Sequence, residues 1–161
     1  MEEISFYQIV KDIIRTEEFK QMKNYQHHIK GNLFNHSLKV AYLCYKHHKK
    51  KKLKIDIVEF VQAALLHDYY LYNLHGDNQK HRFHWFKHPR IALNNAIKKY
   101  PLTKTQQDMI LHHMFPVTII PPKTKEGWLI CYYDKVAAVH DRFGKRNNKK
   151  DKKCKRKEEK L

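Results

Sequence analysis

The feature that most constrains this chain is a histidine–aspartate pair, His67-Asp68, at the end of the apolar segment VEFVQAALL. Further candidate ligands lie at domain-scale intervals around the pair: His36, His88, His112, His113 and Asp134. Neutral imidazoles and carboxylates are ligands that Zn, Mn, Fe and Ni accept, so helices carrying these residues could hold one or two such ions. The residues indicate a metal site, and a metal-dependent hydrolase is our first hypothesis.

Apolar side chains recur every three or four residues along most of the chain, which predicts one helix after another and hence an all-α fold. Asp56 is suited to cap a helix, Pro89 to occupy a first helical position, and Thr103 with Gln106 to form a capping box. We expect a compact bundle of about six main helices. Their expected ranges are 4–21, 34–49, 57–68, 89–99, 103–114 and 124–144.

The length of 161 residues predicts one domain, residues 1–144, followed by a basic tail, residues 145–161. The three cysteines, Cys44, Cys131 and Cys154, are scattered, which favours free thiols in a reducing compartment. The N-terminus has no apolar leader, and no apolar run approaches the roughly 20 residues of a membrane span. We therefore expect a soluble, cytoplasmic protein without membrane contact.

The chain is strongly basic, with 33 Lys and Arg against 16 Asp and Glu and a net charge of +17. Such a charge attracts polyanions, whether nucleotide, nucleic acid or anionic lipid. The tail holds ten basic and three acidic residues, a net +7, which leaves +10 for the rest. We expect the tail to be disordered or a frayed extension of the last helix. Because no nucleic-acid-binding motif accompanies it, nucleic acid is only an alternative partner.

Asp134 interrupts the apolar segment WLICYYDKVAAV. An unpaired carboxylate costs several kcal/mol to bury in such surroundings, so a cationic group should face it. A metal ion would meet this need, and so would Lys135 or Arg90 from a neighbouring helix.

The candidate ligands, taken in their order along the chain, resemble the pattern of a known family. The pattern His36…His67-Asp68…Asp134 resembles the HD-domain superfamily of metal-dependent phosphohydrolases, and NHSLKVA (35–41) and AALLHD (63–68) are similar to its first two motifs. His88 and the pair His112-His113 resemble the branch that holds a second ion. The resemblance covers roughly residues 30–140 and extends to small stand-alone bacterial HD proteins known only as hydrolases.

The resemblance implies an all-helical core with one or two divalent ions, which could be Mn, Fe, Ni, Co or Zn. The implied ligands of the first ion are His36, His67, Asp68 and Asp134. Asp68 would bridge to a second ion held by His88 and His113, with His112 as a possible further ligand. A metal-activated water would attack phosphorus. Lys135 and Arg90 are candidates for holding the substrate phosphate.

Two departures limit the resemblance. The chain lacks the Gly-Lys that usually follows His-Asp in the cyclic-dinucleotide branch, and it lacks the Gly-Tyr-Pro signature, which argues against a cyclic di-GMP phosphodiesterase. Where the deoxynucleotidase-like branch has an acidic residue, this chain has Tyr72 and Asn73, and the next acid is Asp77. An amide cannot donate a proton as a carboxyl group could, so protonation of the leaving group is unassigned.

The segment 69–87 is rich in aromatic residues and histidines, and its length suggests a functional loop or short helices. We expect Phe83, Trp85 and Phe86 to pack in the core rather than to stack on a base. His84 could contact a substrate, and Tyr72 could either line a nucleobase pocket or pack.

Three classes of function are compatible with these residues. We favour hydrolysis of a phosphomonoester or phosphoanhydride of a small, nucleotide-like molecule. The alternatives are a metal-dependent nuclease, which the charge encourages, and a non-enzymatic scaffold or regulatory module. The identity of the metal, the natural substrate and the oligomeric state are left open.

Overall fold

The computed structural model describes residues 4–27, 31–53, 55–72 and 84–143. Within these ranges the helices are α1 (Phe6–Ile14), α2 (Glu17–Gln21), α3 (Leu33–Lys51), α4 (Ile57–Leu66), α5 (His84–Ile97), α6 (Lys104–His112) and α7 (Lys125–Phe143). A short 3-10 turn, η1 (Met22–Asn24), and a small antiparallel pair, β1 (Gln26–His27) and β2 (Gly31–Asn32), lie between α2 and α3. The prediction of an all-α domain is confirmed; these short elements were not predicted.

Helix starts follow the polar residues that precede them. Asp56 accepts hydrogen bonds from the backbone N–H groups of Val58 and Glu59 and so caps α4. Thr103 and Gln106 form a reciprocal capping box at the start of α6. Both caps were predicted, since a side-chain oxygen at this position satisfies N–H groups that have no partner within the helix.

Two predicted helices differ markedly from the observed ones, and the other four differ by at most two residues at either end, so that His67 and Asp68 lie just beyond α4 instead of in its final turn. The range 4–21 is divided into α1 and α2, because the hydroxyl of Thr16 accepts from the N–H of Phe19 and starts a new helix. Pro89 lies inside α5 instead of at its first position. A proline there removes one helical hydrogen bond, to the carbonyl four residues earlier, and the rest of the helix continues around it.

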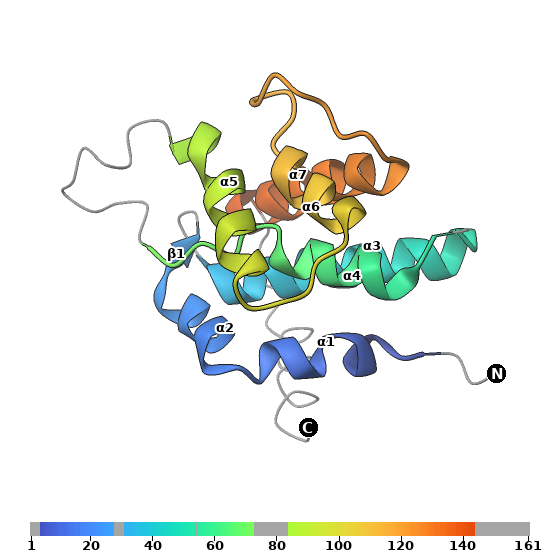
Figure 1. Ribbon diagram of the computed structural model, residues 1–161, viewed down its shortest axis with the longest axis horizontal. Coiled ribbons are helices and arrows are strands. Elements are labelled where there is room, and N and C mark those ends of the chain that lie inside the picture. Colours follow the sequence, from blue (N-terminus) through green and yellow to red (C-terminus); the bar gives the residue numbers. More distant parts are fainter. Residues whose placement is uncertain (1–3, 28–30, 54, 73–83, 144–161) are drawn as a thin grey trace.

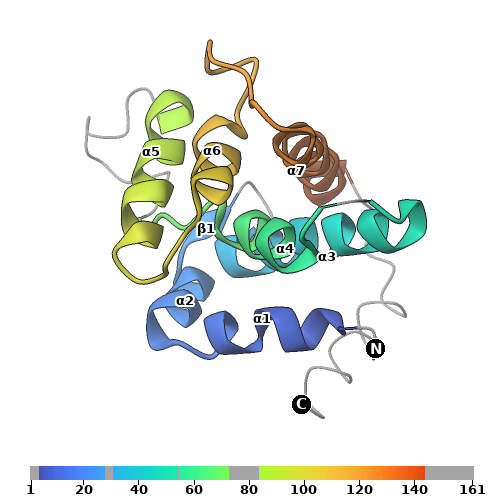
Figure 2. The same ribbon diagram turned by 45° about the vertical axis from the view of Figure 1, so that its right-hand side comes forward.

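The core is built around α4, which packs against α3, α6 and α1. Its side chains Phe60, Val61, Leu65 and Leu66 are fully buried. Figures 1 and 2 show α3 and α4 across the middle of the molecule, with α1 and α2 on one side and α5, α6 and α7 on the other. The C-terminal end of α4, which leads into His67-Asp68, is thereby placed among helices from distant parts of the chain.

Cys44 and Cys131 are buried free thiols, as predicted. Among the described residues, no helix combines the length and the apolar character needed to cross a bilayer. Cys154 and the predicted tail lie outside the described residues, so the boundary at 144 stays a prediction.

Candidate metal centre

Two groups of buried histidine and aspartate side chains meet between α3, α4, α5, α6 and α7. The first group consists of His36, His67, Asp68 and Asp134, and the second of Asp68, His88 and His113. Within each group, the candidate ligand atoms all lie within 4.8 Å of one another. The structure thus brings together every predicted metal ligand except His112.

The ends of two helices place three of these side chains. His67 follows the last residue of α4 as its C-cap, and Asp68 lies in the turn beyond it, where the N–H of Tyr70 donates to the carbonyl of Asp68 at 2.7 Å. His113 is the C-cap of α6 in the same way. Side chains at such positions extend past the helix end, which lets two helices contribute to one site.

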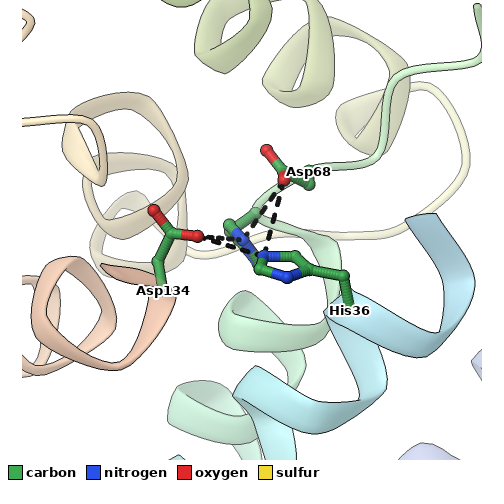
Figure 3. A group of neighbouring side chains, drawn as sticks. His36, Asp68 and Asp134 are labelled. Atoms are coloured by element: carbon green, nitrogen blue, oxygen red, sulfur yellow. Dashed lines mark hydrogen bonds and ion pairs between the residues drawn. The ribbon is translucent and has the colours of Figure 1, made fainter. Parts of the chain in front are cut away.

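In the first group, one oxygen of Asp134 and one of Asp68 point toward two imidazole rings. His36 Nε2 lies 3.0 Å from Asp134 Oδ1 and 3.9 Å from Asp68 Oδ2. Figure 3 shows both carboxylates beside the His36 ring. His67 Nε2 lies 3.5 Å from Asp68 Oδ2 and 3.6 Å from Asp134 Oδ1. Two imidazole nitrogens and two carboxylate oxygens, from three parts of the chain, therefore surround one small volume as potential metal ligands.

The second group uses the other oxygen of Asp68. Asp68 Oδ1 lies 3.2 Å from His88 Nε2 and 3.4 Å from His113 Nε2. The two histidine Nε2 atoms are 3.0 Å apart. Because Oδ2 faces the first group and Oδ1 the second, Asp68 lies between them as a carboxylate that bridges two metal ions would.

Each of the four histidines is oriented by a contact at its other ring nitrogen. In three of them Nδ1 faces a backbone carbonyl oxygen: Ala64 for His67 at 2.7 Å, His84 for His88 at 3.2 Å, and Ile110 for His113 at 2.8 Å. In His36, Nδ1 faces Asp141 Oδ2 at 3.2 Å. An acceptor at Nδ1 fixes the proton there and leaves Nε2 available as a ligand, the usual arrangement around metal sites.

The charges within the first group are strongly coupled. Burial alone would raise the pKa of Asp134, but the hydrogen bond from His36 and the nearby charge of His67 hold it well below its usual range. Burial alone would lower the pKa of His36, yet the hydrogen bonds to Asp134 and Asp141 raise it to about 9. The pKa of His67 is raised against burial by the charge of Asp68. The buried carboxylates of this group therefore favour positive charge beside them, which protons on His36 and His67 supply when no metal is bound.

The donor set fits divalent cations. His67 Nε2 is buried and has no hydrogen-bond partner among the described residues, although two carboxylates lie just beyond hydrogen-bonding distance. A cation coordinated by His67, Asp68 and Asp134 would satisfy that nitrogen and both carboxylates at once. Mixed imidazole and carboxylate ligands suit several transition metals, so the residues do not select one.

A family model for the HD domain matches residues 33–139, which include both ligand groups. The chain belongs to the HD domain family. No curated protein and no solved structure shows a significant match to it. Together, the family match and the complete histidine and aspartate groups make this HD domain a metal-dependent phosphohydrolase.

His112 lies apart from both ligand groups of the HD domain. Its Nδ1 is 2.9 Å from Asp108 Oδ1, and the other oxygen of Asp108 accepts the N–H of Lys123 at 2.9 Å. Adjacent residues of a helix point about 100° apart, so His113 can face the site while His112 faces the loop that leads to α7.

The predicted cationic residues lie in different places. Lys135 lines a cavity beside Asp134, and its ammonium donates to the carbonyl of Cys131 at 3.2 Å. Arg90 is exposed and does not line this cavity. Neither cation supplies the partner that the sequence predicted for buried Asp134, because His36 and His67 face that carboxylate.

The cavity has a volume of about 450 Å³ and reaches Asp68, His88 and Asp134. Trp85 and Phe86 also line it, and they are 49% and 55% exposed. The prediction that these aromatic residues pack in the core is therefore wrong for both; Phe83 lies outside the described residues. They lie in the first turn of α5, and because they are both exposed and part of the cavity lining, a ligand in the cavity could cover them.

Two residues near the site were not assigned a metal-site role from the sequence. Asp141 follows Asp134 by seven residues, which is two helical turns along the same face of α7 and could have been found from that spacing. His84 is buried, its ring stacks on His88 with centroids 4.6 Å apart, and its Nδ1 lies 2.8 Å from the Tyr72 hydroxyl. No comparable spacing signal pointed to the contact between His84 and Tyr72.

Proposed function

We propose that this HD domain hydrolyses a phosphomonoester or phosphoanhydride of a nucleotide-like small molecule, using two divalent metal ions. The observation that carries the proposal is the division of the two Asp68 oxygens between the two ligand groups. A single ion would need only one of these groups. Two buried groups that share one carboxylate support a binuclear site.

The proposed ligands of the first ion are His36, His67, Asp68 and Asp134, and those of the second are Asp68, His88 and His113. When bound, such ions lower the pKa of a water molecule, orient a phosphoryl group and neutralise charge on its oxygens. The protein's own contribution is to bury the ligands, to orient each imidazole through Nδ1, and to open one side of the site to the cavity.

Lys135 is the proposed phosphate-binding residue. It follows the proposed ligand Asp134 directly and lines the same cavity, so its ammonium can approach a phosphoryl group that contacts the metal site. A positive point charge there would neutralise a phosphate oxygen. Arg90 does not line the cavity, so the proposal assigns the phosphate to Lys135.

The cavity lining supports a flat, apolar group on the substrate. Trp85, Phe86, Met114 and Val117 contribute to its walls, and its size lies within the range of about 300–1,000 Å³ typical of small-molecule sites. Exposed aromatic faces suit stacking with a nucleobase, which contributes about 1–3 kcal/mol per base. A nucleotide uses both the metal end and the aromatic end, whereas a sugar phosphate uses only the first.

The alternative functions have less support from the described residues. The basic tail, which was the main argument for a nuclease, lies outside the described residues. The residues considered for leaving-group protonation, Asn73 and Asp77, also lie outside them, so the proposal assigns no general acid. A scaffold without activity does not explain why both ligand groups are complete and open to one cavity.

The test is release of inorganic phosphate from a panel of nucleoside mono-, di- and triphosphates and sugar phosphates. The protein is stripped of metal and reloaded with Mn²⁺, Co²⁺ or Zn²⁺. We expect metal-dependent release from nucleotides that is lost in Asp68→Asn. It should persist in Asp56→Asn, which makes the same change at an exposed helix cap where asparagine serves equally well. Metal-loaded protein that hydrolyses no member of the panel, or an active Asp68→Asn protein, would contradict the proposal.

A further inference from the structure

His36 is oriented differently from the other three proposed histidine ligands. Its Nδ1 faces the carboxylate of Asp141 at 3.2 Å, whereas the other three face backbone carbonyls. A carboxylate is a stronger acceptor than a carbonyl and makes the opposite ring nitrogen a better metal ligand. The orientation of His36 therefore depends on a side chain that can be changed without altering the backbone.

Asp141 is itself held by a lysine. Its Oδ1 accepts from Lys39 Nζ at 2.6 Å, while its Oδ2 accepts from His36 Nδ1. The Asp141 side chain is 23% exposed and that of Lys39 33%, against 1% for His36. The three residues form a line that runs from the partly exposed surface to the buried metal site.

Helical spacing explains why the line forms. His36 and Lys39 lie three residues apart on α3, so their side chains share one face. Asp134 and Asp141 lie seven residues apart on α7 and likewise share a face. The two helices pack against each other, and each carboxylate of this face contacts His36: Asp134 at Nε2 and Asp141 at Nδ1.

We propose that Asp141, held by Lys39, is a positioning pair that sets the affinity of the first ion. The pair fixes the tautomer and the ring orientation of His36, so that Nε2 is presented to the metal together with His67, Asp68 and Asp134. The two histidine ligands of the second ion turn Nδ1 to backbone carbonyls instead, so we expect the affinity of that ion to be unaffected by the pair. The inference rests on the proposed two-ion site and adds residues that lie outside the ligand set.

A purely structural ion pair between α3 and α7 would behave differently. Its removal would weaken the fold and leave the affinity of the correctly folded protein for metal unchanged. Positioning, in contrast, changes the first ion's affinity at constant fold. Loss of a partner next to a metal-bound histidine typically weakens metal binding by about 10- to 100-fold.

The test compares Zn²⁺ affinity, measured by competition with a chromophoric chelator, in the parent protein and in Asp141→Asn. Both are measured in a His113→Ala background, which retains only the first ligand group, and both are repeated with the second group intact. Lys39→Met is a milder variant at a partly exposed site. Glu18→Gln is the matched control, since it breaks an exposed carboxylate–lysine pair of 2.7 Å with Lys99, and neither residue belongs to a ligand group.

We expect Asp141→Asn to weaken the first ion about 10- to 100-fold and to leave the second unchanged, with a smaller loss for Lys39→Met and none for Glu18→Gln. Far-UV circular dichroism and thermal melting of metal-free protein establish that each variant is folded. Folded variants that retain parent affinity would overturn the positioning role, as would equal losses for both ions. A parent protein that binds no metal would instead contradict the proposed function, so the two failures are distinguishable.

Discussion

His88 and His113 face each other through their Nε2 atoms, 3.0 Å apart. Each ring turns Nδ1 to a carbonyl oxygen, of His84 and Ile110 respectively, and a carbonyl can only accept a hydrogen bond. In neutral rings, both Nε2 atoms therefore direct lone pairs at each other. Burial lowers the pKa of His113, which favours the neutral form of that ring. A cation shared by both nitrogens and by Asp68 would remove this repulsion.

The first prediction separates the two adjacent histidines of the HH pair. His113→Ala should reduce bound metal from two ions per chain to one, because the second group loses one of its three ligands. His112→Ala should retain two, since His112 contacts Asp108 and belongs to neither group. Metal content after gel filtration distinguishes these outcomes. Equal losses in the two variants would show that the ligand assignment around α6 is incorrect.

The second prediction concerns pH. In the metal-free fold the pKa of His36 is about 9, above its ordinary value of 6.5. The proton on His36 therefore stabilises the metal-free fold fully below pH 6.5, and this contribution is lost as pH rises through 9. Metal must displace that proton, and any proton on His67, whose pKa is also raised, so apparent metal affinity should rise at least about tenfold per pH unit between pH 7 and 8.5. A chelator competition series that is flat over this range would contradict it.

The third prediction tests the aromatic wall of the cavity. Trp85→Ala should raise KM for a nucleotide by on the order of tenfold, because base stacking on an aromatic side chain contributes about 1–3 kcal/mol. Metal content should not change. Tyr132→Ala is the control, since Tyr132 is 59% exposed but does not line the cavity. If both substitutions raise KM equally, the effect is not stacking in this cavity.

The fourth prediction concerns the helix that carries the His-Asp pair. Leu65 of α4 is fully buried, so Leu65→Ala should lower the free energy of unfolding by about 2–5 kcal/mol. Ile97→Ala, at a side chain that is 48% exposed, should cost much less. Urea unfolding followed by circular dichroism measures both. Similar costs for the two would mean that α4 is not the centre of the core.

The fifth prediction separates a small-molecule enzyme from a nuclease. Removing residues 145–161 should leave kcat/KM for a nucleotide within about twofold, because the proposed ligands and Lys135 all precede the tail. A nuclease that uses the tail's positive charge would lose nucleic-acid affinity and its dependence on salt. Such a loss, with nucleic acid cleaved better than nucleotides, would favour the nuclease.

The sequence predicted the parts of the site that are encoded locally. Local sequence patterns predicted the His67-Asp68 pair, the capping box at Thr103 and the succession of helices. The structure places His67 at the C-terminal end of α4 and His113 at the C-terminal end of α6. The family resemblance added the long-range grouping, which periodicity alone cannot supply. Which helix end faces which is decided by tertiary packing.

The misassigned positions share that physical reason. Trp85 and Phe86 are large aromatic residues of the kind usually found in cores, which is why they were predicted to be buried. The position of α5 beside the cavity leaves them exposed, and this position cannot be predicted from the local sequence. Asp141 was not assigned a role: its seven-residue spacing from Asp134 can be seen in the sequence, but its contacts with His36 and Lys39 on α3 depend on tertiary packing. Long-range contacts of this kind leave no mark on the local hydrophobic pattern.

The central claim is that Asp68 joins two metal ions, and metal content per chain tests it most directly. Untagged protein, reconstituted with Mn, Fe or Zn and analysed by inductively coupled plasma mass spectrometry, should contain two equivalents. In Asp68→Ala both should be lost or reduced together, because each ligand group includes this residue. One equivalent in the parent protein, or an Asp68→Ala protein that still holds two, would contradict the account.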